Sequence, residues 1–262
     1  MSNILKEIVS KKKEEIIITK QQYSLSSLIK LLPKKENRNF KKLLKYSQDN
    51  KKNNIIGEIK KSSPSLGEII QNYEPDKIAA EYEKSGAGAI SILTEKTFFE
   101  GKTDHISLLN RKTKLPILRK DFIIDEYQIY ESKVFLADAI LLIASILNDS
   151  EINKFIKIAE EIGLDCIIEI HNKEELKRAI DINYPVIGIN NRNLDTLTVN
   201  TNNTLNLMKD IPSKFIVVGE SGIKNYSDIK SYNESGVFNF LIGENILKSN
   251  NISLKFKELL NK

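Results

Sequence analysis

From Asn54 onward, the sequence alternates short runs of β-branched and other apolar residues with longer amphipathic stretches of helical spacing. The alternation predicts parallel strands, because a parallel strand needs a crossover connection before the next one can pair with it. Eight such units close a single (β/α)8 TIM barrel, an α/β architecture that suits a chain of 262 residues. An open doubly wound sheet is the alternative, but the GxGxxG motif that often follows its first strand does not occur at that place.

The boundaries of the units follow from the change of period and from turn and capping residues. Asn172 is a suitable N-cap for one helix, for example, and Gly163 suits the end of another. The predicted strands are Ile55–Ile59, Ala89–Leu93, Pro116–Arg119, Ala139–Ile143, Cys166–Ile170, Val186–Ile189, Phe215–Val218 and Phe238–Ile242. The predicted crossover helices are Pro75–Lys84, His105–Asn110, Glu126–Phe135, Ser150–Ile162, Lys173–Asp181, Thr201–Lys209, Tyr226–Ser235 and Ile252–Leu260.

The segment before the first strand has a helical pattern. Ile4 and Ile8 begin one apolar stripe, a second one follows, and Pro33 interrupts the segment. We expect residues 1–46 to form an N-terminal helical extension and residues 47–262 to form the barrel. No internal linker separates them, so the chain is predicted to be one structural domain overall.

The N-terminal segment is also basic. Residues 1–50 carry 12 Lys and Arg against 5 Asp and Glu, whereas the rest of the chain is nearly neutral. Such a segment could bind nucleic acid. Its basic residues, however, lie among Leu and Ile in helical patterns, and no aromatic residues are spaced for base stacking. A solvated helix face, or a field that attracts a phosphorylated substrate, is the favoured interpretation, and we expect no nucleic-acid partner.

The rarer residue types exclude several classes of protein. The single cysteine, Cys166, rules out an intrachain disulfide framework, and two histidines, His105 and His171, rule out a His-rich metal site. Cys166 is expected to be a buried structural thiol, and His171 to be a loop or capping residue, with a role in the pocket as the alternative. No apolar run is long enough to span a membrane, and the N-terminus lacks the apolar core of a signal peptide. We therefore expect a cytoplasmic monomer without membrane contact.

Polar residues stand at the C-terminal ends of six of the eight predicted strands, which is where barrel enzymes place their active sites. Glu58 and Lys60 are two residues apart, so they point to the same side of the first strand. Crowding by a second lysine, Lys120, would help a lysine to lose its proton near neutral pH. The other strand-end residues are Glu169, Asn190, Arg192, Glu220, Ser221, Gly243 and Glu244.

Two of these strand ends have the composition of a phosphate site. Glu220-Ser221-Gly222 follows the seventh strand, and Ile242-Gly243-Glu244 follows the eighth. The loops after these two strands often bind phosphate in barrels through backbone N–H groups, and glycine lets the backbone approach an oxyanion. The sequence therefore predicts a phosphorylated small-molecule substrate.

The segment Ile55–Ser65, with the sequence IIGEIKKSSPS, closely resembles the first-strand signature of the indole-3-glycerol-phosphate synthase family. Further segments resemble later motifs of the family in the same order: Ser91–Thr94, Phe98–Gly101, Leu118–Phe122, Glu169–His171, Asn190–Leu194, Glu220–Ile223 and Leu241–Glu244. Gly57 departs from the family, which commonly has Ala there. The resemblance covers nearly the whole chain and includes the basic N-terminal helices.

The resemblance implies a carbon–carbon lyase (carboxy-lyase) of tryptophan biosynthesis that needs no metal and no cofactor. It closes the indole ring of 1-(2-carboxyphenylamino)-1-deoxyribulose 5-phosphate, losing CO2 and then water, to give indole-3-glycerol phosphate. Lys120 matches the general acid, Lys60 the cation for the substrate carboxylate and Glu169 the acid–base group for dehydration, although the sequence leaves the division of work between the lysines open. Glu58 and Asn190 match residues that orient the reacting groups.

The resemblance also implies which residues bind the substrate. Those implied to contact its body are Ser63, Pro64, Phe99, Phe122, Leu141, Arg192, Leu194 and Glu220. Those implied to hold its phosphate are Ser63, Ser221, Gly222, Gly243 and Glu244, the last through its backbone N–H. A related phosphosugar isomerase barrel is the alternative enzyme, but its chemistry would want a Cys at a strand end, whereas Cys166 lies inside a predicted strand.

Overall fold

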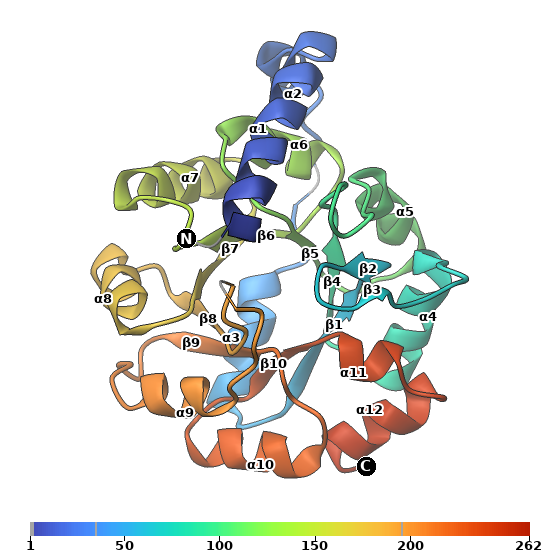
Figure 1. Cartoon of the computed structure of the whole chain (residues 1–262), viewed down its shortest axis with the longest axis vertical. Helices are drawn as coiled ribbons and strands as arrows, with labels where there is room; N and C mark the ends of the chain where they lie inside the picture. The colour runs from blue at the N-terminus through green and yellow to red at the C-terminus, as the bar shows by residue number, and fades with distance from the viewer. Residues whose placement is uncertain (1–2, 35, 195) are drawn as a thin grey trace.

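In the computed structural model, which describes residues 3–34, 36–194 and 196–262, eight parallel strands form a closed barrel (Figure 1). Neighbouring barrel strands follow one another in the sequence, and β1 closes the barrel by pairing with both β10 and β4. The strands are β1 (Asn54–Ile59), β4 (Ala89–Leu93), β5 (Ile117–Lys120), β6 (Ala139–Ile143), β7 (Asp165–Ile170), β8 (Val186–Asn190), β9 (Ile216–Glu220) and β10 (Asn239–Ile242). The predicted (β/α)8 barrel is confirmed.

A helix follows each barrel strand, as the sequence predicts, and the predicted ends of strands and helices agree with the observed ones within two residues. These helices are α4 (Pro75–Ser85), α5 (Asp104–Lys112), α6 (Glu126–Val134), α7 (Asp149–Glu161), α8 (Lys173–Ile182), α9 (Asn202–Met208), α10 (Tyr226–Glu234) and α12 (Ile252–Leu260). Two short elements were not predicted: a hairpin of β2 (Ser62–Ser63) and β3 (Gly67–Glu68), and the helix α11 (Glu244–Leu247). Both lie just after barrel strands. No helix among the described residues is long and apolar enough to cross a membrane.

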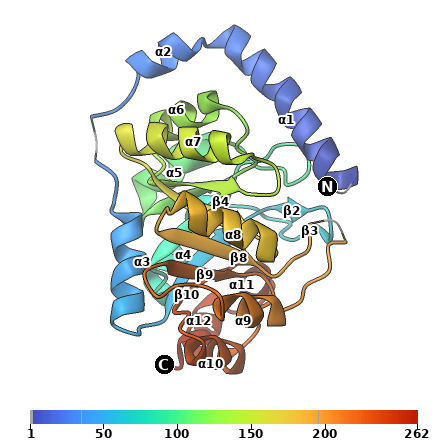
Figure 2. The same cartoon turned by 90° about the vertical axis from the view of Figure 1, so that its left-hand side faces the viewer.

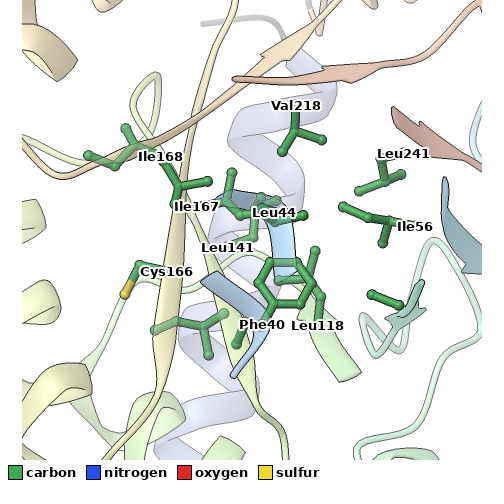
Figure 3. Packing of buried hydrophobic residues seen from close by; sticks show 14 of the residues in the cluster. Phe40, Leu44, Ile56, Leu118, Leu141, Cys166, Ile167, Ile168, Val218 and Leu241 are labelled. Carbon is green, nitrogen blue, oxygen red and sulfur yellow. The ribbon is translucent and has the colours of Figure 1, made fainter. Parts of the chain in front are cut away.

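Helix α3 (Phe40–Asp49) closes the N-terminal end of the barrel. Figure 2 shows α3 at one end of the barrel and the β2–β3 hairpin at the other. Phe40 and Leu44 are fully buried and lie close to the apolar layer inside the barrel (Figure 3). The Asn239 side chain donates a hydrogen bond to the Leu44 carbonyl (3.1 Å), and Gln48 bridges to the backbone of β9. Among the described residues, α3 therefore covers the barrel interior at this end.

Helices α1 (Asn3–Gln22) and α2 (Leu25–Lys30) lie outside the barrel, and α1 brings the N-terminus toward the C-terminal mouth (Figure 2). An ion pair of 3.0 Å between the buried groups of Lys12 and Asp121 ties α1 to the loop after β5. A second ion pair, Lys20–Asp125, is partly exposed. The predicted boundary between the extension and the barrel, after residue 46, falls within α3, and the division stays a prediction.

The departure at Gly57 has a packing reason. Gly57 lies on the outer face of β1, and a Cβ atom there would be 2.3 Å from Cδ2 of Tyr82, a fully buried side chain of α4. The Tyr82 hydroxyl donates a hydrogen bond to the backbone carbonyl of Glu58 (3.1 Å). The absence of a side chain at Gly57 therefore lets α4 approach the strand that carries Glu58.

Substituting Gly57→Ala should lower the free energy of unfolding by about 1–3 kcal/mol, because the tyrosine ring or the strand must move. Gly219→Ala in β9 is the matched control, since the nearest atom to its Cβ would be 3.7 Å away. It should change the stability by less than about 0.5 kcal/mol. Denaturant unfolding followed by circular dichroism measures both. Equal effects of the two substitutions would contradict the packing argument.

Candidate active site

A pocket of about 640 Å³ opens at the C-terminal ends of the barrel strands. Its lining includes most of the residues that the sequence predicts for the site: Glu58, Lys60, Phe99, Lys120, Phe122, Leu141, Glu169, Asn190, Arg192, Leu194, Glu220, Ser221, Gly222, Gly243 and Glu244. Ser63 and Pro64 are placed differently, because they line a smaller neighbouring cavity together with Ile4, Leu5 and Ile8 of α1. The cavities share Lys60, Phe99 and other side chains, so the two spaces adjoin.

Lys120 is at the centre of the charged groups in the pocket. Its ammonium group donates to Glu169 Oε2 (2.9 Å) and Glu220 Oε2 (3.0 Å), which come from β7 and β9. Burial alone would lower the pKa of Lys120, but these carboxylates and that of Glu58 outweigh it and raise the pKa well above its usual value. The crowding by a second lysine that the sequence suggested does not lower the pKa of Lys120. Lys120 is a protonated acid.

Glu58 and Lys60 form an ion pair at the end of β1, as their spacing predicted. The Glu58 side chain is buried, which favours its neutral form, but the charges of Lys60 and Lys120 outweigh the burial and lower its pKa. Gly243 lies against this carboxylate, since a Cβ atom there would be 2.5 Å from Glu58 Oε1. The turn after β10 can approach the ion pair only because Gly243 has no side chain.

The other two carboxylates around Lys120 have different protonation states. The Glu169 side chain is buried, but Lys120 and His171 outweigh the burial and lower its pKa, so Glu169 is ionised. Burial and the neighbouring Glu169 carboxylate raise the pKa of Glu220 to about 7 against the charge of Lys120. Glu220 Oε1 makes no hydrogen bond within the described part of the chain. Of the two carboxylates that accept a hydrogen bond from Lys120, Glu169 is therefore ionised, whereas Glu220 titrates near neutral pH.

One wall of the pocket is apolar. The rings of Phe99 and Phe122 lie with centroids 6.2 Å apart, and Leu141 and Leu194 also line the space. Phe122 and Leu141 are buried in the protein, with exposed fractions of 8% and 1%. This wall gives a flat aromatic group a surface beside the charged centre.

The loops after β8, β9 and β10 form another part of the pocket. Ser221 (φ 64°) and Gly222 (φ 85°) both have left-handed backbones in the turn after β9. The Ser221 hydroxyl donates to Asn190 Oδ1 (2.8 Å), and the Arg192 backbone N–H donates to the same oxygen (3.0 Å). Asn190 therefore connects the loop after β8 to the loop after β9, which belongs to the predicted phosphate site.

Glu244 begins α11 at the rim of the pocket, and two cations surround its carboxylate. Arg192 Nη2 is 3.6 Å from Glu244 Oε2, and Lys248 Nζ is 3.1 Å from Oε1. Sequence reasoning missed Lys248, together with Ser65, Lys224 and other lining residues. Lys248 had no signal of its own, because it is the C-cap of α11, a short helix that was not predicted. Lys224 lies two residues after Gly222, so its place in that loop was a signal that could have been used.

Two residues outside the pocket lining were also discussed from the sequence. Cys166 is fully buried, and burial raises the pKa of its thiol. It points away from the barrel interior (Figure 3), so it cannot act in the pocket, and the expectation of a structural thiol is confirmed. His171 lies in the loop before α8, whose N-cap is Asn172, and its imidazole lies between Glu169 and Glu175. Within the described residues, no group of three or more His, Cys, Asp and Glu is arranged to hold a metal ion.

The comparisons with known structures support the fold. KGPDC from Streptococcus mutans has a TM-score of 0.61 at 14% identity, with 80% of this chain and 97% of that chain covered. A 3-hexulose-6-phosphate synthase structure has a TM-score of 0.62 at 13% identity, with 79% and 98% covered. At this level of identity the likeness extends to the barrel alone.

The comparisons with sequences are much closer. Residues 5–259 match the family model described as indole-3-glycerol phosphate synthase. The indole-3-glycerol phosphate synthase of Acetivibrio thermocellus is 49% identical over 204 residues, which cover 78% of each chain. That of Thermoanaerobacter pseudethanolicus is 45% identical over 245 residues, covering 94% of this chain and 92% of the relative. That of Alkaliphilus metalliredigens is 43% identical over 257 residues, covering 98% and 97%. Because the family model matches nearly the whole chain, and two of these relatives are matched over more than 90% of both chains at 43–45% identity, the chain belongs to the indole-3-glycerol phosphate synthase family.

Proposed function

We propose that the barrel-mouth pocket closes the indole ring of 1-(2-carboxyphenylamino)-1-deoxyribulose 5-phosphate, with loss of CO2 and water. The family's activity is a decarboxylating ring closure in tryptophan biosynthesis, and its members are lyases. The observation that carries the proposal is the position of Lys120 between Glu169 and Glu220, beside an apolar wall and within reach of the Ser221–Gly222 turn. This combination suits an aromatic, phosphorylated substrate whose reaction needs proton transfer.

Lys120 is the general acid of the proposal. When the aromatic ring carbon attacks the ketose carbonyl, the carbonyl oxygen must take up a proton. The raised pKa of Lys120 keeps its ammonium group protonated at neutral pH, so a proton is available at the start of each turnover. Lys60, paired with Glu58 at the edge of the pocket, is proposed to hold the substrate carboxylate until it leaves as CO2.

Glu169 is the proton acceptor of the proposal. Its lowered pKa makes it a carboxylate in the resting enzyme, so it can take a proton when the condensed intermediate loses water. Asn190 and Glu58 are proposed to orient these groups, and Glu220 to share Lys120 with them. Over the cycle Lys120 is proposed to give two protons, one to the carbonyl oxygen and one to the hydroxyl that leaves as water. Glu169 takes one proton from carbon and can return it to Lys120, with which it is in contact. The second proton comes from solvent, because the substrate carboxylate leaves as neutral CO2.

The remaining residues are proposed to bind the substrate. The aromatic ring would lie against Phe99, Phe122, Leu141, Leu194 and Pro64. The phosphate would lie against Ser63, Ser221, Gly222, Gly243 and the backbone N–H of Glu244, with Arg192 near it. We also propose that the protein acts as a monomer in the cytoplasm, without a nucleic-acid partner, since this chain by itself supplies the charged centre, the apolar wall and the loops that the proposed reaction needs. The isomerase alternative has no support in the pocket, since Cys166 is buried outside it.

The direct test is a fluorescence assay for indole formation. Purified protein is mixed with the carboxyphenylamino-deoxyribulose phosphate, with and without EDTA. We expect an indole signal that rises equally in both samples. Silence from a folded protein would overturn the proposed reaction.

Lys120→Ala should lower kcat by about 10³- to 10⁴-fold, because it removes the proton donor. Lys154→Ala, which removes an exposed lysine of α7, is the matched control and should leave kcat unchanged. Thermal unfolding of both variants shows whether the fold is kept, since the change leaves buried carboxylates without their cation. A folded Lys120→Ala variant with a near wild-type rate would contradict the role of Lys120 as acid.

Ser221→Ala should raise KM about tenfold and change kcat by less than about threefold, because a hydrogen bond to a charged phosphate is lost in the ground state and the transition state alike. The same variant is assayed with the substrate that lacks the phosphate. There the wild type and the variant should have similar values of kcat/KM. An unchanged KM with a collapsed kcat would show that Ser221 does not hold the phosphate.

A further inference from the structure

Contacts on both sides fix the imidazole of His171, although a residue at the end of a strand does not need such contacts. It lies between β7 and α8, and its side chain is 10% exposed. Its backbone N–H donates to Glu175 Oε2 (2.8 Å), and its Nδ1 is 3.1 Å from the same oxygen. Asn172 donates to the other oxygen of Glu175 (2.9 Å), and the His171 carbonyl accepts from Asn203 (3.0 Å). These contacts fix both the backbone and one side of the imidazole.

The other side of the imidazole is directed at the reaction centre. His171 Nε2 is 3.3 Å from Glu169 Oε1, while Lys120 donates to Glu169 Oε2. Nε2 is buried and makes no aligned hydrogen bond within the described part of the chain. The contact between Nε2 and Glu169 is therefore an electrostatic one, and each oxygen of Glu169 faces a different nitrogen.

The charges around Glu169 explain why the contact with His171 affects its protonation state. Lys120 on β5 is shared with Glu220 on β9 and with Glu58 on β1, so its charge does not belong to Glu169 alone. Burial lowers the pKa of His171, but Glu169 and Glu175 outweigh the burial and raise it to about 10. An imidazolium at this place is a cation that faces Glu169 and not the other two carboxylates of the centre.

We propose that His171 is a positioning residue that acts through Glu169. It fixes the plane of the carboxylate against Lys120 and keeps Glu169 ionised, so that Glu169 starts each turnover as a proton acceptor. Glu175 holds the imidazole in place for this purpose. The inference rests on the proposed function, because it concerns the protonation state that the proposed proton acceptor needs.

The sign of the pH effect follows from the charge. If Glu169 must be ionised, kcat falls as the pH drops through its pKa in the enzyme–substrate complex. Removing a neighbouring cation makes protonation easier and raises that pKa. The acidic limb of the kcat profile should therefore move to higher pH when the imidazolium is lost.

The variants are His171→Ala and His171→Gln, assayed for indole formation over a range of pH. His171→Ala should lower kcat about 10- to 100-fold, with KM within about threefold, because it loosens the geometry and removes the charge. It should also move the acidic limb up by about one pH unit. His171→Gln keeps a donor but not the charge, so it should recover part of kcat and retain the shifted limb. His105→Gln changes the other histidine of the chain, which lies against Tyr73 outside the pocket, and should leave kcat and the pH profile unchanged.

A second measurement does not depend on activity. In an NMR titration of the histidine ring protons, His171 should titrate well above pH 8, whereas Glu175→Gln should lower its pKa because one of its two carboxylate neighbours becomes neutral. A His171 that titrates near its ordinary value of about 6.5 would overturn the inference even if the variants do not fold. An active wild type with unshifted limbs in both variants would overturn it too and leave the proposed function standing. A folded wild type without indole formation would overturn the proposed function itself.

Discussion

The structure depends on burying a lysine next to three carboxylates. A buried ammonium group is tolerated only when opposite charges and hydrogen bonds replace the water it has lost. Lys120 of β5 gains these from β1, β7 and β9, which are not adjacent strands and whose ends face Lys120 only because the barrel is closed. The closed end formed by α3 keeps water from the other side of this centre, since Phe40 and Leu44 are fully buried there. The charged centre of the pocket therefore cannot form unless the barrel is closed.

The same strand connects this centre to the N-terminal helix. On β5, Arg119 points outward and Lys120 inward, and Asp121 follows them in the loop. Asp121 is buried among Arg119, Thr94 and Lys12, whose hydrogen bonds and charges lower its pKa against the cost of burial. Lys12 belongs to α1, so the helix is anchored at Asp121, one residue away from Lys120. Movement of α1 would therefore change the small cavity that Ile4 and Leu5 line, and it would also displace the residue next to Lys120.

Much of the site could be predicted from the sequence, and the failures have physical reasons. The period of two in a strand predicted that Glu58 and Lys60 lie on the same side, and in the structure they form an ion pair. The hairpin at Ser62 and the helix at Glu244 were missed, because elements of two and four residues have no period to detect. The crowding by a second lysine that the sequence suggested does not lower the pKa of Lys120, because carboxylates from three strands surround it and the sequence cannot say how many do. The roles of the individual residues stay predictions until they are tested.

The sequence by itself determined the order of strands and helices, because hydrophobic period is a local property that each segment carries on its own. It also determined which residues stand at strand ends, since the phase of a strand follows from its own side chains. Only the tertiary structure decided which of those ends meet. Lys120 contacts Glu169 and Glu220, which are 49 and 100 residues away, and His171 faces Glu169 with its second nitrogen. Distances across a barrel, and the charge states that follow from them, depend on the closure of all eight strands together.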